Sequence, residues 1–173
     1  SKETKAILNA VEDLGHDPHW LRQENAAISI EGSEVRVEPD VDVVANRLLL
    51  SNDEHPMEGV GLALTLHNLA PMLNEPMAAT TALHKFASAA AMAEAGVPIP
   101  DAVLALANER LNEARAQFGD RAVYKTAIGT HGGGTWMVEL DDPVNAQVGD
   151  RHAFLQEYLD HEEGRHHDLR VYV

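Results

Sequence analysis

The segment that most constrains the fold is a glycine-rich stretch at residues 128–134, which lies between two short apolar segments, 122–126 and 135–140. Both flanking segments have the residue types of strands, so the stretch predicts a strand–loop–strand hairpin. Because a strand follows and Gly-Lys-Ser/Thr is absent, the loop is neither a Walker loop nor a Rossmann turn. Glycines let a backbone approach an anion closely. Taken alone, the loop is therefore either a phosphate-binding loop or a mobile turn.

The rest of the second half of the chain alternates helical and strand-like segments. Residues 78–95 have an apolar stripe at helical spacing, with Thr80 or Thr81 as the cap and Gly96 as the stop. A second helix is predicted over 108–118, with Asn108 as its cap. The remaining segments are predicted strands at 102–106, 154–159 and 169–173, and a charged loop at 160–167. Residues 141–149 are predicted as a polar loop, with a weak helix as the alternative.

The first half of the chain predicts a small α/β unit over residues 1–76. Its predicted elements are helices at 1–14 and 56–69, a hairpin of 26–30 with 34–37 around Gly32, and short strands at 40–45 and 72–73. An α/β domain usually places a strand before such a first helix, and the chain ends on an apolar strand. We therefore expect a fragment of a longer protein.

Charge limits the partners of this chain. It has 13 Lys and Arg against 28 Asp and Glu, a formal net charge of −15. No basic stripe is present to neutralise phosphates, and no basic amphipathic face is present for a membrane, so nucleic acid and membranes are excluded as partners. An acidic, alanine-rich chain with few lysines is typical of a cytoplasmic protein from an organism living in high salt. An ordinary acidic mesophile protein is the alternative.

Lysine is scarce, so its positions are informative. The chain has four lysines and nine arginines, and no cysteine for disulfide or thiol chemistry. Lys125 lies at the end of the strand before the glycine-rich stretch, where it can reach a phosphate oxygen as a point charge. Lys85 lies at a helix start. Chance placement is the alternative for either lysine taken alone.

Two further groups give weaker signals. The strand segment 155–159 can offer its backbone to an adenine edge, and Asp168 can accept a ribose hydroxyl. The histidines His161, His166 and His167 stand among acids, but without the spacing of a metal site, so a solvated loop is favoured there. His84 and His131 flank the two lysines and either line the same cleft or lie on the surface.

Taken in order, these segments resemble the RimK-like branch of the ATP-grasp superfamily over residues 72–173, and more weakly over 1–71. The resemblance implies an α/β (α+β) fold: an incomplete pre-ATP-grasp domain at 1–76, then the ATP-grasp N-terminal subdomain and the start of the C-terminal subdomain at 77–173. The matching motifs are Met72-Leu73-Asn74, Leu83-His84-Lys85-Phe86, Met92-Ala93-Glu94-Ala95-Gly96-Val97-Pro98-Ile99-Pro100, Val123-Tyr124-Lys125, Gly129-x-x-Gly132-x-Gly134, Gln156-Glu157-Tyr158-Leu159 and Asp168-Leu169-Arg170-Val171.

The resemblance implies an ATP-dependent carboxylate–amine ligase that works through an acyl phosphate. The amine is often an amino acid such as glutamate, and the acceptor carboxylate is not specified. The alternatives are an ATP-grasp relative that binds nucleotide without ligation, and a non-catalytic α/β interaction domain. Homo-oligomerisation stays open.

The resemblance also implies the binding residues. Lys85 and Lys125 would contact phosphates, Lys125 would also lie near adenine, and Asp168 would hold the ribose. Arg170 would face a phosphate or the acceptor. The loop residues over the phosphates would be Gly129, His131, Gly132, Gly133 and Gly134, and the adenine segment would be Glu157, Tyr158 and Leu159.

The resemblance places the Mg²⁺ ligands downstream of Val173, so no metal ligand and no catalytic residue is assigned within this chain. We therefore expect the 173-residue chain alone not to turn over.

Overall fold

The computed structural model of this chain describes residues 2–22, 25–47, 56–129 and 133–160. The chain forms two compact units, Ser1–Arg47 with Val60–Pro76 and Leu48–Gly59 with Met77–Val173. Their mixture of helices and sheets confirms the predicted α/β class. Several predicted positions lie outside the described residues: His131, Gly132, Asp168, Arg170, the histidines at 161, 166 and 167, and the strand at 169–173.

The first unit contains a hairpin and a two-strand parallel pair. In the pair, the amide of Asn46 donates to Leu73 O at 3.0 Å, and Asn74 Nδ2 donates to Asn46 O at 3.1 Å. These bonds join segments far apart in the sequence. The elements of this unit are α1 (Lys2–Asp13), β1 (Ala27–Glu31), β2 (Glu34–Glu38), β3 (Val44–Ala45), most of α2 (Pro56–Leu69) and β4 (Met72–Leu73).

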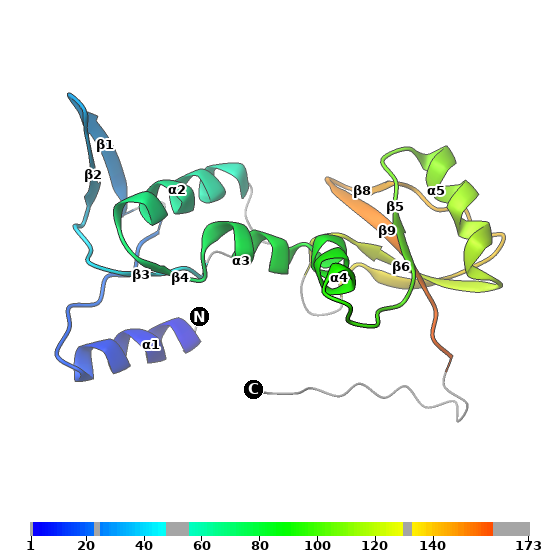
Figure 1. Ribbon diagram of the computed structural model, residues 1–173, viewed down its shortest axis with the longest axis horizontal. Coiled ribbons are helices and arrows are strands. Elements are labelled where there is room, and N and C mark those ends of the chain that lie inside the picture. Colours follow the sequence, from blue (N-terminus) through cyan, green and yellow to red (C-terminus); the bar gives the residue numbers. More distant parts are fainter. Residues whose placement is uncertain (1, 23–24, 48–55, 130–132, 161–173) are drawn as a thin grey trace. The chain divides into compact units, whose positions relative to one another are not determined.

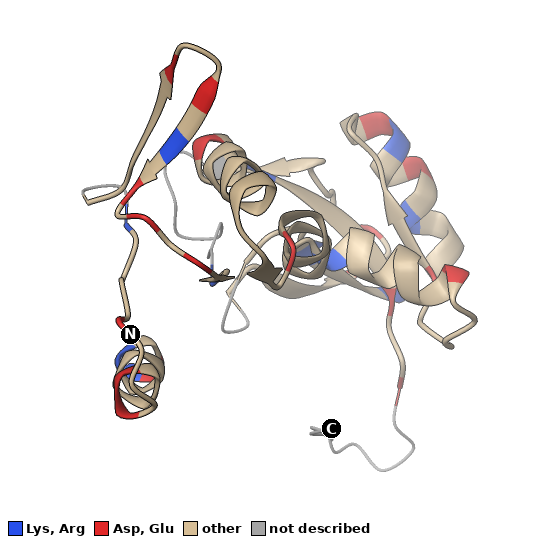
Figure 2. Ribbon diagram, turned by 60° about the vertical axis from the view of Figure 1, so that its left-hand side comes forward, with Lys and Arg blue, Asp and Glu red and all other residues tan. Residues whose placement is uncertain are grey.

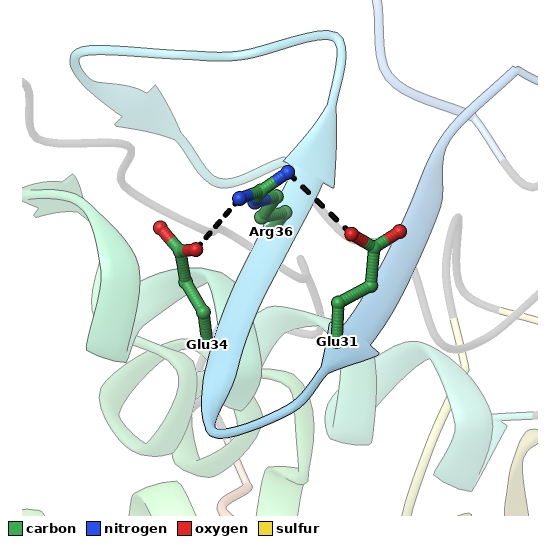
Figure 3. A network of polar contacts seen from close by, with 3 residues as sticks. All are labelled: Glu31, Glu34 and Arg36. Atoms are coloured by element: carbon green, nitrogen blue, oxygen red, sulfur yellow. Dashed lines mark hydrogen bonds and ion pairs between the residues drawn. The ribbon is translucent and has the colours of Figure 1, made fainter.

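The β1–β2 hairpin is amphipathic. Its register pairs Ile28 with Val37 on one face. On the other face, Arg36 contacts Glu34 Oε2 at 2.7 Å and Glu31 Oε2 at 3.5 Å, so one guanidinium joins both strands near the turn (Figure 3). The turn begins at Gly32, whose φ of 64° suits a residue without a side chain.

The second unit is built on a five-stranded antiparallel sheet with the strand order β5-β9-β6-β7 and with β8 paired to β9. Helices lie before and between the strands in the sequence (Figure 1). The elements are α3 (Pro76–Leu83), α4 (Lys85–Glu94), β5 (Ala102–Leu104), α5 (Asn108–Arg115), the 3₁₀ turn Ala116–Phe118, β6 (Arg121–Thr126), β7 (Thr135–Glu139), β8 (Gln147–Val148) and β9 (Arg151–Glu157).

The two helices α4 and α5 cover opposite faces of this sheet. Strand side chains alternate between faces. Ala122, Tyr124 and the fully buried Leu155 face the core with Leu111 of α5. On the other face, Phe86 of α4 meets Phe154 edge-on, with ring centroids 5.5 Å apart. Figure 1 shows the sheet between these helices.

The structure corrects the predicted helix at 78–95. The chain breaks at His84 into α3 and α4, and the His84 side chain caps α4 by accepting a hydrogen bond from the amide of Ala87 at 3.2 Å. The predicted threonine cap is therefore wrong. The break arises because the amide of Lys85 donates to Ala127 O, at 2.8 Å, instead of continuing the helix.

Three smaller predictions in the second unit are also wrong. The N-cap of α5 is Ala107 and not Asn108, whose Oδ1 accepts from the amide of Ala146 at 2.8 Å. The polar loop at 141–149 contains β8, because a backbone ladder with β9 outweighs the local polarity. Strand β9 starts at Arg151 and ends at Glu157, so the strand predicted at 154–159 is shifted along the chain.

Charged positions are distributed over helices, the hairpin and connecting segments (Figure 2). The net acidity therefore does not belong to one element. Within the described parts of the chain, no helix is both long and apolar enough to cross a bilayer.

Candidate functional site

Lys85 is held at the C-terminal end of β6 by both its backbone and its side chain. Its amide donates to Ala127 O at 2.8 Å, and its Nζ donates to Thr126 O at 3.0 Å. His84 is the N-cap of α4, so Lys85 is the first residue of the helix. The ammonium group is therefore anchored beside the start of the glycine-rich loop.

Lys125 lies on the face of the sheet that carries Phe154. The two residues are directly paired in the β6–β9 register, and the Lys125 Nζ donates a hydrogen bond to Gln156 Oε1. The amide oxygen of a glutamine orients the ammonium without neutralising it, as a carboxylate would. The charge of Lys125 therefore stays available to an anion.

The pKa values of both lysines are lowered. Burial lowers the pKa of Lys85, and the positive charges of Lys125 and Arg151 lower it further. Burial also lowers the pKa of Lys125. Like charges that are partly removed from water are relieved when an anion binds between them. Holding these partly buried positive charges close together therefore costs free energy when no anion is bound.

The described part of the glycine-rich loop packs tightly against the end of β6. The amide of Thr126 donates to Gly134 O at 2.8 Å, and Gly134 has a φ of 80°. A Cβ on Gly129 would lie 3.2 Å from Lys85 Nζ and from Gly133 O. Glycine at this position therefore leaves the ammonium group of Lys85 uncrowded beneath the loop.

The segment that follows β9 lies at the opposite end of β6. Glu157 pairs with Ala122, whereas Ala153 pairs with Thr126. At a strand rise of about 3.3 Å per residue, the two ends are separated by about 13 Å. A ligand that contacts both ends must therefore be elongated, and Lys125 lies near the end at Thr126.

We name residues 157–159 the hinge segment. The amide of Glu157 donates to Asp101 O at 2.7 Å, and its carboxylate accepts from the Asp101 amide at 3.4 Å. The carboxylate therefore faces β5. The side chain of Leu159 is 53% exposed and leaves apolar surface at this end of the sheet.

The predicted residues are thus placed in two groups. Lys85, Lys125 and the described glycines of the loop gather at one end of β6. Glu157 pairs with Ala122 near its other end, and Tyr158 and Leu159 follow Glu157. His131, Gly132, Asp168 and Arg170 lie outside the described residues.

Sequence reasoning missed Gln156 and Arg121 as members of this face. Gln156 is the hydrogen-bond partner of Lys125. Arg121 contacts the Tyr158 ring and the Asp160 carboxylate. The alternation of side chains along β6 could have identified Arg121, because positions 121 and 123 must share a face with Lys125.

A metal cluster is not found among residues 2–22, 25–47, 56–129 and 133–160: no three His, Asp or Glu side chains gather there to hold an ion. The described residues therefore do not form a Mg²⁺ site by themselves.

Comparison with solved structures identifies related folds. A RimK-domain ATP-grasp protein from Sphaerobacter thermophilus matches with a TM-score of 0.65 and 19% identity, over 92% of this chain and 61% of that one. The ATP-grasp ligase PsnB, solved with a minimal precursor, matches with a TM-score of 0.60 and 19% identity, over 92% and 61%. The D-cycloserine synthetase DcsG matches with a TM-score of 0.61 and 15% identity, over 91% and 55%.

Comparison by sequence adds no closer relative. No protein-family model matches the chain, and no curated protein matches it significantly. The chain spans about three fifths of the length of the first two of these structures. At these identities the likeness concerns the fold, and the chain has the fold of part of an ATP-grasp ligase structure.

Proposed function

We propose that this chain is the nucleotide-binding part of an ATP-dependent carboxylate–amine ligase of the RimK-like type. The observation that carries the proposal is the convergence of Lys85 and Lys125 beside a glycine-rich loop at one end of β6. The likeness of the fold to ATP-grasp structures supports the same assignment.

In this proposal the phosphates of ATP bind at the lysine end of β6. Lys85 and Lys125 neutralise phosphate oxygens, and the loop with Gly129, Gly133 and Gly134 closes over the β- and γ-phosphates. The lowered lysine pKa values support this role, because an anion restores the favourable state of both ammonium groups. The residues His131 and Gly132 of the same loop are proposed to take part as well.

The adenine is proposed to lie at the other end of the face, against the hinge segment. Backbone groups of Glu157, Tyr158 and Leu159 would hydrogen-bond the base, since the Glu157 side chain faces Asp101. The exposed side chain of Leu159 supports this placement, because a base covers apolar surface. Asp168 is proposed to hold the ribose, and Arg170 a phosphate or the acceptor.

The proposed reaction has two steps. An acceptor carboxylate oxygen attacks the γ-phosphorus of ATP, ADP leaves, and an acyl phosphate forms. An amine nitrogen then attacks the acyl carbon, phosphate leaves, the nitrogen loses a proton, and an amide results. The residues of this chain contribute positioning and charge neutralisation, which dominate phosphoryl transfer. Glutamate is the proposed amine, and Mg²⁺ is proposed to be held by residues outside this chain.

Other parts of the assignment are proposals too. We propose residues 1–76 as a pre-ATP-grasp domain and 77–173 as the ATP-grasp domain, which the two compact units support. We propose a cytoplasmic protein adapted to high salt, supported by the net charge of −15 and the four lysines. The chain alone is proposed to be inactive in ligation.

Calorimetric titration of the chain with ADP and ATP tests the proposal. Lys125→Met should weaken nucleotide binding roughly 10- to 100-fold, because a charged hydrogen bond to phosphate is lost. Lys5→Met on α1 is the matched control and should leave the affinity unchanged. Equal affinity of the Lys125→Met variant and the wild type would contradict the proposal.

A further inference from the structure

Arg121 is attached to the segment that follows β9 by two different interactions. Its Cζ lies 4.9 Å from the centroid of the Tyr158 ring, and its Nη2 lies 3.3 Å from Asp160 Oδ2. Arg121 itself is the first residue of β6 and pairs with Glu139 of β7 in the strand ladder. A residue anchored in the sheet therefore contacts a segment that has left it.

The two contacts stand on either side of Leu159. Strand β9 ends at Glu157, so residues 158–160 no longer receive the regular hydrogen bonds of the ladder. Such a segment keeps backbone freedom that is lost when a ligand binds. Two contacts from one guanidinium to neighbouring residues limit that freedom before binding.

We infer that Arg121 is a positioning residue for the hinge segment. It holds Tyr158 and Asp160 so that the backbone between them is already arranged to receive the adenine, and it does not itself contact the nucleotide. The inference rests on the proposed function only for the identity of the ligand. The attachment of the segment to Arg121 is a property of the chain without ligand.

Arginine suits this task better than lysine. Its planar guanidinium stacks on an aromatic ring and donates in its own plane to a carboxylate at the same time. A lysine at position 121 keeps the charge but offers only a point charge to one partner. The Arg121→Lys variant should therefore keep part of the positioning of residues 158–160, whereas the Arg121→Gln variant should lose it.

The first experiment measures hydrogen exchange in the chain without ligand. Arg121→Gln should raise the exchange rate of the backbone amides of residues 158–160, and Asp160→Asn should raise it less. Arg110→Gln is the matched control: Arg110 is an exposed arginine on α5, paired with Glu113 at 3.1 Å. Unchanged exchange at 158–160 in Arg121→Gln, with a normal melting temperature, would overturn the inference.

The second experiment compares ATP with tripolyphosphate, which lacks the base and the ribose. Arg121→Gln should weaken ATP binding roughly three- to thirtyfold, the combined range of an exposed cation–π contact and an exposed ion pair. It should leave tripolyphosphate binding unchanged, because the phosphates are proposed to bind at the other end of β6. Equal losses for both ligands would indicate a general structural role and would overturn the inference.

The two experiments separate the inference from the proposed function. Failure of the wild-type chain to bind ATP or tripolyphosphate would contradict the proposed function. Faster hydrogen exchange in Arg121→Gln would then still support the attachment of residues 158–160 to Arg121, but the role of Arg121 in adenine binding would be overturned. Binding of both ligands by the wild type, with no selective loss in Arg121→Gln, would overturn only the inference.

Discussion

The two faces of strand β6 differ in what their side chains do. Ala122, Tyr124 and Thr126 point to the α5 side and are buried. Val123 and Lys125 point to the α4 side and remain half-buried. A single strand thus separates residues that stabilise the unit from residues that can meet a ligand. Changes on one face should alter stability, and changes on the other should alter binding.

Most polar side chains on the α5 side of the sheet bond to other groups of the protein, although Arg115 Nε has no hydrogen-bond partner among the described residues. The hydroxyl of Tyr124 donates to Asn145 O, and Asn112 bonds both the carbonyl and the amide of Val144. Arg115 is 2% exposed and donates to the carbonyl oxygens of Gly119, Asp120 and Val138. The α4 face instead carries lysines whose pKa values are lowered. Hydrogen-bonded polar groups thus gather on the α5 side, and the binding residues that we propose lie on the α4 side.

The largest effect on this comparison should come from Arg115→Ala. The substitution leaves buried carbonyl oxygens without donors and opens a cavity, so the free energy of unfolding should fall by about 3–5 kcal/mol. Urea denaturation measures this loss, and Arg110→Ala, on the exposed side of the same helix, should cost less than about 0.5 kcal/mol. A loss under about 1 kcal/mol for Arg115→Ala would contradict the view that residues on the α5 side stabilise the unit.

A smaller effect is expected for Gly134→Ala. The residue has a φ of 80°, and a Cβ there would overlap the Thr126 side chain. The free energy of unfolding should fall by about 1–3 kcal/mol, and ADP affinity should fall with it. Gly149→Ala is the control, because Gly149 has a φ of 62° but open space around it. The same loss in both variants would show that backbone conformation alone sets the cost.

The smallest effect should appear in the pH dependence of the α4 face. Burial lowers the pKa of Lys125, so its protonated form costs stability in the folded chain at neutral pH. Raising the pH from the lowered folded pKa toward the ordinary lysine value of about 10.4 removes that cost. Relative to Lys125→Met, the wild type should gain stability across this window, while its ADP affinity falls. Parallel curves in urea denaturation would contradict the shift.

The sequence predicts most elements of the second unit because its strands and helices are separated by glycine and proline. The hairpin around the loop, β6 and β7, follows from two apolar segments flanking residues 128–134. Scarcity and position draw attention to Lys85 and Lys125, the resemblance to ATP-grasp proteins predicts them as phosphate-binding residues, and the structure brings them to one end of β6. Their contact with a nucleotide stays a prediction.

Features set by long-range contacts could not be predicted. Residues 78–95 read as one helix because nothing in them breaks the apolar pattern, and the break at His84 depends on a bond to Ala127. Asn108 is of a residue type that is common at N-caps, but its side-chain oxygen accepts a hydrogen bond from the amide of Ala146. Gln156 gains its role only when β9 pairs with β6.

The double attachment of Lys85 has a mechanical consequence. Its backbone and its side chain bond to consecutive residues at the end of β6, Ala127 and Thr126. The first turn of α4 therefore cannot rotate away without breaking both bonds. We expect the helix start, the strand end and the base of the glycine-rich loop to open as one cooperative unit, with the amides of Lys85 and Thr126 exchanging at matched rates.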